Sequence, residues 1–304
     1  MRALVARKLA GPDAIQLIET PMPEPAEGQV RIKVAAAAVN PVDVAVSAGL
    51  LVQSGLTAAR DQFGLGWDVA GTVDAGDLPP GTAVVGLADL LGRPLKTHAE
   101  YVVLDTDAVA KAPAGMELIP ASTFALNAST ALQALRAFES GQTILITGAA
   151  GGVGGYAVEL AKHFGLSVIA TAGDQDEDLV RRLGADHFIA RSKDLPTEVR
   201  RIVPTGVDGL VDAAVTGIAA QEAVRNRGRH VHPQGGPRPP QLRGITVEQL
   251  FVQSSRDDLE QLVQLAESGV ISARVADTYP LEDAATAYKR LAKGGVRGRL
   301  VVVP

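Results

Sequence analysis

A glycine-rich turn carries the clearest chemical signal in this sequence. It reads Gly148-Ala149-Ala150-Gly151-Gly152-Val153-Gly154-Gly155 and follows the apolar segment Thr143–Thr147. Aligned with the pattern G-x-G-x-x-G, it places Ala149, Gly151 and Gly154 at the fixed positions. A side chain at the central position would block a diphosphate, whereas Gly151 lets backbone N–H groups and the positive end of the next helix approach the anion. Gly154 permits close packing of that helix against the strand.

The elements around this turn decide whether it indicates dinucleotide binding or only close packing. Glycine-rich turns are common, and glycines at the start of a helix can serve packing alone. Here the turn lies in a strand-turn-helix-strand unit of about thirty residues, the context in which the pattern indicates dinucleotide binding. We therefore expect the chain to bind a nicotinamide dinucleotide at this helix start.

The end of the next strand bears on the choice between NADH and NADPH. NAD-binding proteins place an acidic residue there for the ribose hydroxyls, but Thr171, Ala172 and Gly173 stand at this point. Without a carboxylate the site can accept a 2′-phosphate, which favours NADPH and leaves NADH possible. The only cations noted nearby are Arg181 and Arg182, and we expect the acidic run 174–178 to be a solvated helix start.

A third part of the cofactor site is expected where a later strand ends, just after Asp212. His230 and His232 follow further on, and we expect histidines facing solvent at a strand end rather than a metal site. The predicted cofactor-binding residues are Gly148, Ala149, Ala150, Gly151, Gly152, Val153, Thr171, Ala172, Gly173, Ala213 and Ala214.

Alternating strands and helices position these residues. This alternation predicts a parallel sheet covered by helices on both faces. The predicted elements are helix 121–138, strand 143–147, helix 156–164, strand 167–171, helix 177–183, strand 187–190, helix 195–203, strand 209–213 and helix 218–226.

The first third of the chain has a different character. Short apolar segments at 30–39, 69–73, 83–87 and 101–104 are separated by Gly and Pro, which predicts a compact, mostly antiparallel β domain. After residue 257 we expect helices 259–267 and 281–291 and a final strand 299–303, and the Gly- and Pro-rich segment 235–240 predicts a mobile loop.

Composition excludes several classes of function. The 304 residues are 46% hydrophobic and 21% charged, which is typical of globular proteins, and their length favours two domains. A net charge of −5 without any dense basic run argues against nucleic-acid binding. We expect no membrane segment and a cytoplasmic protein, because no signal-peptide pattern or long apolar run is present. The absence of Cys removes any thiolate nucleophile or metal ligand.

Several ordered motifs together resemble one enzyme family over nearly the whole chain. They are 40–43 (Asn-Pro-Val-Asp), 66–71 (Gly-Trp-Asp-Val-Ala-Gly), 129–131 (Ser-Thr-Ala), 149–155, 183–186 (Leu-Gly-Ala-Asp) and 298–301 (Gly-Arg-Leu-Val). The sequence resembles the zinc-independent quinone oxidoreductase and enoyl reductase branch of the medium-chain dehydrogenases and reductases, which includes zeta-crystallin. The resemblance implies a GroES-like, mostly β catalytic domain of residues 1–120 completed by 265–304. It also implies a doubly wound Rossmann domain of residues 121–264, NADPH as cofactor, and a homodimer.

The same resemblance lets the zinc question be posed residue by residue. Zinc-dependent relatives hold the metal with a Cys, a His just after the position of Gly66, and another Cys near Leu126. Here Asn40 and Trp67 stand at the first two positions, and the chain has no Cys. A site built from His98 and Glu100 is chemically conceivable, but we expect His98 to be structural. The sequence therefore predicts no catalytic metal.

Without a metal, conjugated acceptors are the easier substrates, because a hydride can add to them while the negative charge spreads onto oxygen. Asn40 and Thr130 are the candidate catalytic groups. Because Asn40 precedes Pro41, its alternative role is that of an ordinary turn residue. Leu50, Trp67 and Phe251 are the candidate substrate-pocket residues. Relatives often carry Tyr where Leu50 stands, so we expect a more apolar pocket here and a proton from water.

Three functions remain open at this point. The first is an NADPH-dependent reductase of quinones or α,β-unsaturated carbonyls, acting on a small-molecule substrate. The second is a dedicated enoyl reductase or a zinc-free dehydrogenase of a biosynthetic pathway. The third is a cofactor-binding protein with little turnover.

Overall fold

The computed structural model describes residues 1–233 and 236–304. The chain divides into two compact units. Unit 1 contains Met1–Leu126, Gln253–Ser268 and Ala273–Pro304, and unit 2 contains Asn127–Val252 and Gly269–Ser272. The structure thus assigns residues 121–126 and 253–264 to unit 1, whereas the sequence-based boundaries placed them in the Rossmann domain. Residue 235, the first of the predicted loop 235–240, lies outside the described residues.

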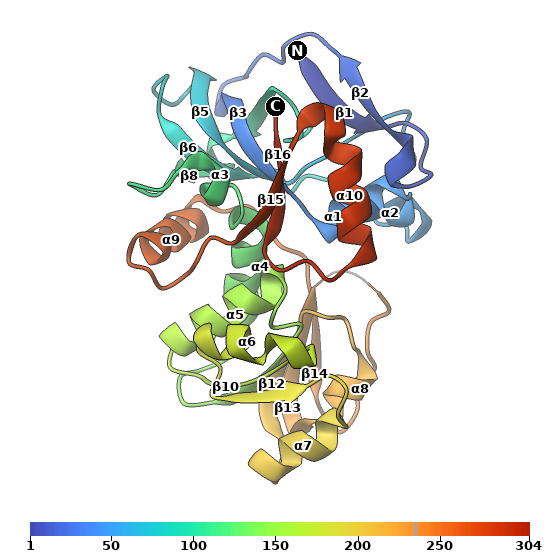
Figure 1. Ribbon diagram of the computed structural model, residues 1–304, viewed down its shortest axis with the longest axis vertical. Coiled ribbons are helices and arrows are strands. Elements are labelled where there is room, and N and C mark those ends of the chain that lie inside the picture. The colour runs from blue at the N-terminus through green and yellow to red at the C-terminus, as the bar shows by residue number, and fades with distance from the viewer. Residues whose placement is uncertain (234–235) are drawn as a thin grey trace. The chain divides into compact units, whose positions relative to one another are not determined.

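Unit 2 contains a parallel sheet of six strands in the order β11-β10-β9-β12-β13-β14 (Figure 1). The chain moves outward from β9 through β10 to β11 and then returns to the other side of β9, which is the doubly wound order of a Rossmann domain. The strands are β9 (Thr143–Thr147), β10 (Ser167–Ala172), β11 (His187–Ala190), β12 (Val207–Asp212), β13 (Val224–Pro233) and β14 (Thr246–Leu250). The helices are α5 (Gly152–His163), α6 (Glu177–Arg182), α7 (Leu195–Ile202) and α8 (Ile218–Gln221).

The central strand β9 shows why this sequence forms such a sheet. Ile144, Leu145 and Ile146 are all fully buried, so neighbouring residues pointing to opposite faces are both covered. A strand with three consecutive buried apolar residues at its centre is typical of a parallel sheet that helices cover on both faces.

Two predicted helices of this region are wrong in extent. The predicted helix 121–138 is two helices, α3 (Leu118–Ala121) and α4 (Ala125–Leu135), because the hydroxyls of Ser122 and Thr123 donate to the carbonyls of Ile119 and Pro120 and end α3. The predicted helix 218–226 stops after one turn, as α8, and the chain enters β13 at Val224.

Unit 1 is mostly antiparallel β-structure, as expected. A three-stranded sheet has the order β2-β1-β4, and a larger one has the order β15-β16-β3-β5-β6-β8, with β7 also paired to β3. The strands are β1 (Arg2–Ala6), β2 (Ile15–Glu19), β3 (Gln29–Val39), β4 (Phe63–Gly64), β5 (Asp68–Gly76), β6 (Ala83–Leu87), β7 (Tyr101–Asp105), β8 (Val109–Lys111), β15 (Val275–Pro280) and β16 (Arg299–Val303). The remaining helices are α1 (Pro41–Ser47), α2 (Leu50–Gln53), α9 (Arg256–Glu267) and α10 (Ala284–Lys293). Short 3-10 turns lie at Pro12–Ala14, Thr106–Ala108, Asp174–Asp176 and Leu281–Asp283.

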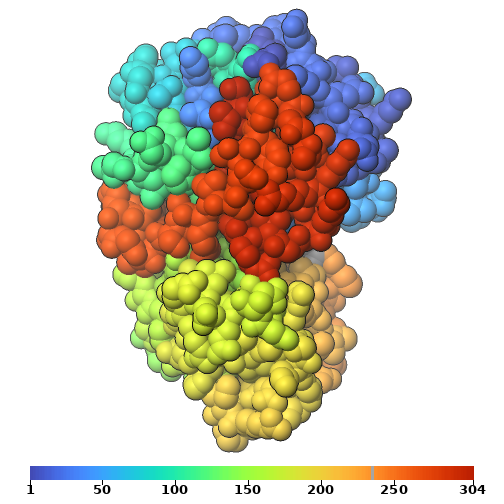
Figure 2. All heavy atoms as spheres, viewed as in Figure 1, coloured from blue at the N-terminus to red at the C-terminus, as the bar shows by residue number. Residues whose placement is uncertain are grey.

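Segments far apart in the sequence build the core of unit 1. Strand β16 lies between β15 and β3, with Leu300 opposite Val39. Val39, Leu300 and Tyr288 of α10 are fully buried in one hydrophobic cluster. In the space-filling view, atoms of the C-terminal segment lie directly against those of the N-terminal segment within this unit (Figure 2). Within residues 1–233 and 236–304, no helix has the length and apolar character that crossing a membrane requires.

Candidate cofactor and substrate sites

The glycine-rich turn has the geometry predicted for it. Strand β9 ends at Thr147, and α5 begins at Gly152 with Gly151 as its N-cap. Gly148 has a positive φ of 64°, a conformation that favours glycine. A Cβ on Gly154 would lie 2.2 Å from the carbonyl oxygen of Gly148, so only glycine allows the helix to approach this closely. The result is an open stretch of backbone at the head of a 12-residue helix.

Asp212 fastens the loop that faces this turn. Its Oδ1 accepts hydrogen bonds from Thr147 Oγ1 (2.6 Å), Thr216 N (3.0 Å) and Thr216 Oγ1 (2.7 Å), and its Oδ2 accepts one from Gly217 N (2.7 Å). Burial alone would raise the pKa of this carboxyl, but the imidazole of His230, then Thr147 and Thr216, stabilise the carboxylate and lower the pKa well below its usual range. The carboxylate therefore holds the loop in the charged form at neutral pH.

The same loop closes one side of the turn. Ala214 N donates to Thr147 Oγ1 at 3.0 Å, and a Cβ on Gly148 would lie 3.2 Å from the Cβ of Ala214. The structure thus brings the predicted residues Ala213 and Ala214 beside the predicted residues 148–153 at the carboxyl end of the sheet. In open α/β sheets, ligands bind at this end of the strands, at the point where the strand order reverses.

The predicted residues Thr171, Ala172 and Gly173 lie at the end of the neighbouring strand. Ala149 N donates to Thr171 O at 3.1 Å, which joins the turn to β10. Asp176 is buried, and its Oδ2 accepts a hydrogen bond from Gly173 N at 3.1 Å, so this acid is not part of a solvated helix start. Asp174 and Glu177 are exposed, as expected for that segment.

A cation at this position was missed by the sequence analysis. Ala172 lies opposite Ala190 in the parallel pair β10 and β11, and Arg191 N donates to Ala172 O at 2.8 Å. The exposed Arg191 therefore lies beside Gly173, the last of the three residues at which the sequence analysis expected room for a 2′-phosphate. Arg181, which was considered instead, forms an ion pair with Glu177 at 2.8 Å.

The prediction that His230 and His232 face solvent is wrong. Both are buried, and as residues two apart on a strand they point to the same face of the sheet, in which β13 lies between β12 and β14. Their ring centroids are 5.6 Å apart, and His230 Nε2 lies 3.6 Å from Asp212 Oδ2. Burial, and then the neighbouring His230, lower the pKa of His232.

Unit 1 contains a buried polar centre around Asn40. The Nδ2 of Asn40 donates to Asp68 Oδ2 at 2.7 Å and to Ala38 O at 3.2 Å, and its Oδ1 accepts from Arg299. Asp68 also accepts from Leu126 N at 2.5 Å, and burial raises the pKa of this carboxyl to about 6. Both ends of the Asn40 amide are therefore engaged by protein groups.

Asp43 joins two loops of this centre. Its Oδ2 accepts from Asn40 N at 2.8 Å, and its Oδ1 accepts from Gly66 N at 2.7 Å. Gly66 has a φ of 95°, and a Cβ on it would lie 2.2 Å from Thr97 Oγ1. Glycine is therefore required where these two segments pack together.

The residues of unit 1 considered as zinc ligands do not suit the metal. Trp67 offers no ligand atom, and the amide of Asn40 is engaged as described. His98 is structural, as predicted: its Nδ1 lies 2.8 Å from Tyr288 Oη, and its Nε2 lies 3.2 Å from Ala38 O. Burial lowers the pKa of His98, which keeps the ring neutral. Glu100 pairs instead with Arg2 at 2.8 Å. Among the described residues, no three His, Asp or Glu side chains come together in a way that could hold a metal ion.

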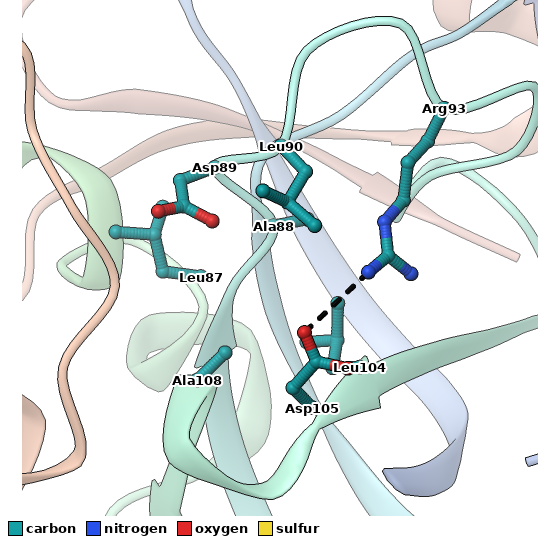
Figure 3. Close-up of a pocket in the computed structure, with 8 residues that line it drawn as sticks. All are labelled: Leu87, Ala88, Asp89, Leu90, Arg93, Leu104, Asp105 and Ala108. Atoms are coloured by element: carbon teal, nitrogen blue, oxygen red, sulfur yellow. Dashed lines mark ion pairs between the residues drawn. The ribbon is translucent and has the colours of Figure 1, made fainter. Parts of the chain in front are cut away.

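The predicted substrate residues are distributed over both units. In unit 1, Leu50 is 51% exposed and Trp67 is buried; in unit 2, Thr130 is buried in α4 and Phe251 is 40% exposed. None of them lines the small hollow of unit 1 that Figure 3 shows, which is formed by Leu87, Ala88, Asp89, Leu90, Arg93, Leu104, Asp105 and Ala108. Across that hollow, Arg93 reaches Asp105 at 3.5 Å (Figure 3).

A lysine in unit 1 was also missed by the sequence analysis. Lys96 is only 4% exposed, and its Nζ lies 3.5 Å from the centroid of the Trp67 ring. Burial lowers the pKa of this amine to about 7. Nothing in the local sequence marks Lys96, because its burial depends on packing against residues about thirty positions away.

Two family models match the chain. One is the alcohol dehydrogenase GroES-like domain, over residues 26–114, and the other is described as zinc-binding dehydrogenase, over residues 183–302. The matches fall in unit 1 and in the second half of the chain, respectively.

Similar proteins and structures span the whole chain. An Arabidopsis thaliana NADPH-dependent alkenal/one oxidoreductase, chloroplastic, is 32% identical over 100% of this chain and 80% of the relative. A quinone oxidoreductase of Sus scrofa is 27% identical over 100% of this chain and 98% of the relative. The solved quinone oxidoreductase from Coxiella burnetii has a TM-score of 0.86 and 28% identity over 100% of this chain and 99% of that chain. A solved NAD-dependent alcohol dehydrogenase has a TM-score of 0.87 and 29% identity, with both chains fully covered.

These matches agree with the doubly wound unit 2 and the GroES-like unit 1. The chain therefore belongs to the medium-chain dehydrogenase and reductase superfamily, in its quinone oxidoreductase branch.

Proposed function

We propose that this protein is an NADPH-dependent reductase that transfers a hydride to a quinone or an α,β-unsaturated carbonyl without a catalytic zinc. The observation that carries the proposal is the open backbone turn at the head of α5, where a Cβ at Gly154 would strike the carbonyl of Gly148. Relatives named for NADPH-dependent alkenal/one reduction and for quinone reduction support the reaction class.

The residues at the end of β10 support NADPH over NADH. No acidic side chain stands at Thr171, Ala172 or Gly173 to repel a 2′-phosphate, and the exposed Arg191 lies beside them. Asp176 is occupied by its hydrogen bond to Gly173 N. When bound, NADPH supplies a hydride from its nicotinamide ring.

The donor set of unit 1 supports a conjugated acceptor. An alcohol dehydrogenase needs a Lewis acid to stabilise the alkoxide, and the protein groups around Asn40, Trp67 and His98 do not suit one. In a conjugated carbonyl the developing charge resides on oxygen, so hydrogen-bond donors suffice.

The proposed roles of the substrate residues follow from their contacts. Because both ends of its amide are engaged, we propose Asn40 as a positioning residue that holds Asp68 and Arg299, rather than a group touching substrate. Thr130 stays a candidate hydroxyl donor, and Leu50, Trp67 and Phe251 stay candidates for the apolar wall of the pocket.

Calorimetric titration with both cofactors, followed by an acceptor screen, tests this function. We expect NADPH to bind roughly tenfold or more tightly than NADH and to be oxidised by quinones or enones. Tight binding without turnover on any acceptor would identify a cofactor-binding protein, and turnover of one enoyl class alone would identify a dedicated enoyl reductase. If neither cofactor perturbs the protein at millimolar concentration, the proposal fails. Stoichiometric zinc by elemental analysis would contradict the zinc-free part.

We also propose a homodimer in the cytoplasm. Strand β14 is the outer strand of the six-stranded sheet, and its unpaired edge suits pairing with a second copy. Light scattering after size-exclusion chromatography measures the mass, and a value near 31.5 kDa would contradict the dimer.

A further inference from the structure

Lys96 is a buried amine that lacks the partner such a group normally has. It is 4% exposed, and its Nζ rests on the face of Trp67. Within the described residues, the structure gives this Nζ neither a hydrogen bond nor an ion pair. Lysines are almost never buried unless paired, because desolvating the charged amine is costly. An unpaired lysine in the interior therefore calls for a functional explanation.

The backbone fixes where this side chain begins. Gly64 N donates to Arg93 O at 2.9 Å, and His98 N donates to Leu65 O at 2.9 Å, so the two segments run side by side. A Cβ on Gly64 would lie 2.5 Å from the carbonyl carbon of Leu95. Because the main chain is packed this closely, only the flexible side chain of Lys96 can move, and it can move the Nζ without moving the fold.

The carboxylates around Lys96 are engaged elsewhere. Asp43 accepts from Asn40 N and Gly66 N, and Asp68 accepts from Asn40 Nδ2 and Leu126 N. Asp89 accepts from Ser254 N at 2.8 Å. Burial is the largest effect on Lys96 and disfavours its charged form, as does the nearby charge of Arg93. The three carboxylates favour the charged form, but they do not offset burial, so the pKa of Lys96 falls to about 7.

We propose that Lys96 is a catalytic residue of the reductase proposed above: its Nζ donates a hydrogen bond to the carbonyl oxygen of a substrate bound beside Trp67 and supplies the proton that the reduction consumes. Trp67 is a candidate wall of the substrate pocket, and Lys96 is the amine in contact with its ring. The proposal rests on the proposed function, since it assigns a group to the same reaction.

The protons and electrons of this step balance. A hydride adds to the β-carbon of the conjugated carbonyl, the double-bond electrons shift to the oxygen, and one N–H proton of the ammonium passes to that oxygen. The enol then tautomerises to the saturated ketone, and the neutral amine regains its proton from water. Each turnover therefore consumes one hydride and one solvent proton.

The protonation state of Lys96 can be followed without measuring enzyme activity. Trp67 is the only tryptophan in the sequence, so its fluorescence reports the amine on its face. We expect the emission to change with a midpoint near pH 7 in the wild-type protein and to be flat there in Lys96→Met. An unchanged transition in Lys96→Met, or no wild-type transition between about pH 5 and pH 9, would overturn the assignment.

Kinetics then separate proton transfer from simple charge. Loss of a general acid typically lowers rate by about 100-fold or more, so we expect kcat of Lys96→Met to fall by roughly that factor with NADPH affinity unchanged. Lys96→Arg keeps the charge and the hydrogen bond but holds its proton, so its KM should stay near the wild-type value while its kcat stays low. Exposed Lys33 provides the matched control, and Lys33→Gln should behave as wild type.

The outcomes distinguish the two proposals. A wild-type protein without turnover on any acceptor contradicts the reductase function, while the fluorescence titration still reads Lys96 directly. A wild-type protein that turns over, with Lys96→Met within twofold of its kcat, contradicts the role of Lys96 alone. Thermal unfolding checks the fold of each variant, and Lys96→Met should be at least as stable as wild type because it removes a buried charge.

Discussion

Replacing Asp212 by Asn tests how the cofactor-facing loop is held. The carboxylate accepts four hydrogen bonds, three at Oδ1 and one at Oδ2. An Asn that keeps its oxygen at the Oδ1 position points its NH2 group at Gly217 N, so two donors face each other. The bonds from Thr147 and Thr216 also lose the strengthening effect of the negative charge.

The expected loss follows from these contacts. Hydrogen bonds to charged groups contribute about 1.5–3 kcal/mol each, so losing one and weakening three should lower the free energy of unfolding by about 3 kcal/mol at neutral pH. Because the folded pKa of Asp212 is lowered, its contribution is fully present above the unfolded pKa of about 3.9 and is lost as the pH falls below that value toward the folded pKa. The difference between wild type and Asp212→Asn should therefore shrink below about pH 4.

Urea unfolding followed by circular dichroism, repeated over a pH series, measures this difference. Asp208 is the matched control, since it lies on the same strand but its side chain is 28% exposed and accepts from Thr143 N and Arg225 Nε. We expect Asp208→Asn to cost only about 1 kcal/mol. Equal losses for the two variants, or a difference that persists undiminished at pH 3, would refute the reasoning.

Three further substitutions probe the cofactor site and its support. Gly154→Ala places a Cβ 2.2 Å from the Gly148 carbonyl oxygen and should raise the Kd for NADPH at least about tenfold in calorimetry; an unchanged Kd contradicts the diphosphate cradle. Arg191→Ala should raise the Kd for NADPH by roughly tenfold and leave that for NADH unchanged, and a parallel loss for both cofactors would exclude a 2′-phosphate contact. Gly209→Ala places a Cβ 2.0 Å from Phe138 Cε1 and should lower the free energy of unfolding by about 2 kcal/mol in urea without changing NADPH affinity. A wild-type Tm for that variant would show that the ring can move aside.

Local signals were enough to predict the strand, the glycine-rich turn and the helix. The apolar residues 144–146 of β9, the glycines at 148, 151 and 154, and the helix that follows are neighbours in the sequence, so their pattern is visible together. The parallel sheet covered on both faces and the mostly antiparallel unit followed from the same kind of local pattern, whereas the doubly wound Rossmann domain was implied by the family resemblance.

Features that depend on distant packing were not visible. Helix-forming residues after Ile218 favoured a long helix, but pairing with β12 draws the chain into a strand from Val224, and the same pairing buries His230 and His232. Strands β14 and β15 are mostly exposed and lack a sustained apolar alternation, so they were not predicted.

The two proposed site residues that the sequence analysis missed have the same origin. The register of β10 with β11 places Arg191 beside Gly173, and segment 62–67 buries Lys96. In each case the residue is unremarkable in its own stretch of sequence and gains its role from a partner strand or loop.

The position of β16 between β15 and β3 also dictates an order of assembly during synthesis. All six strands of the unit 2 sheet have left the ribosome before residues 299–303 are made, whereas the end of β3, residues 37–39, has no partner on the β16 side until then. Arg299, which donates to Val39 O and Asn40 Oδ1, arrives with that same strand. The nascent chain can therefore hold the complete sheet of unit 2 while unit 1 still lacks the cation that completes the centre around Asn40.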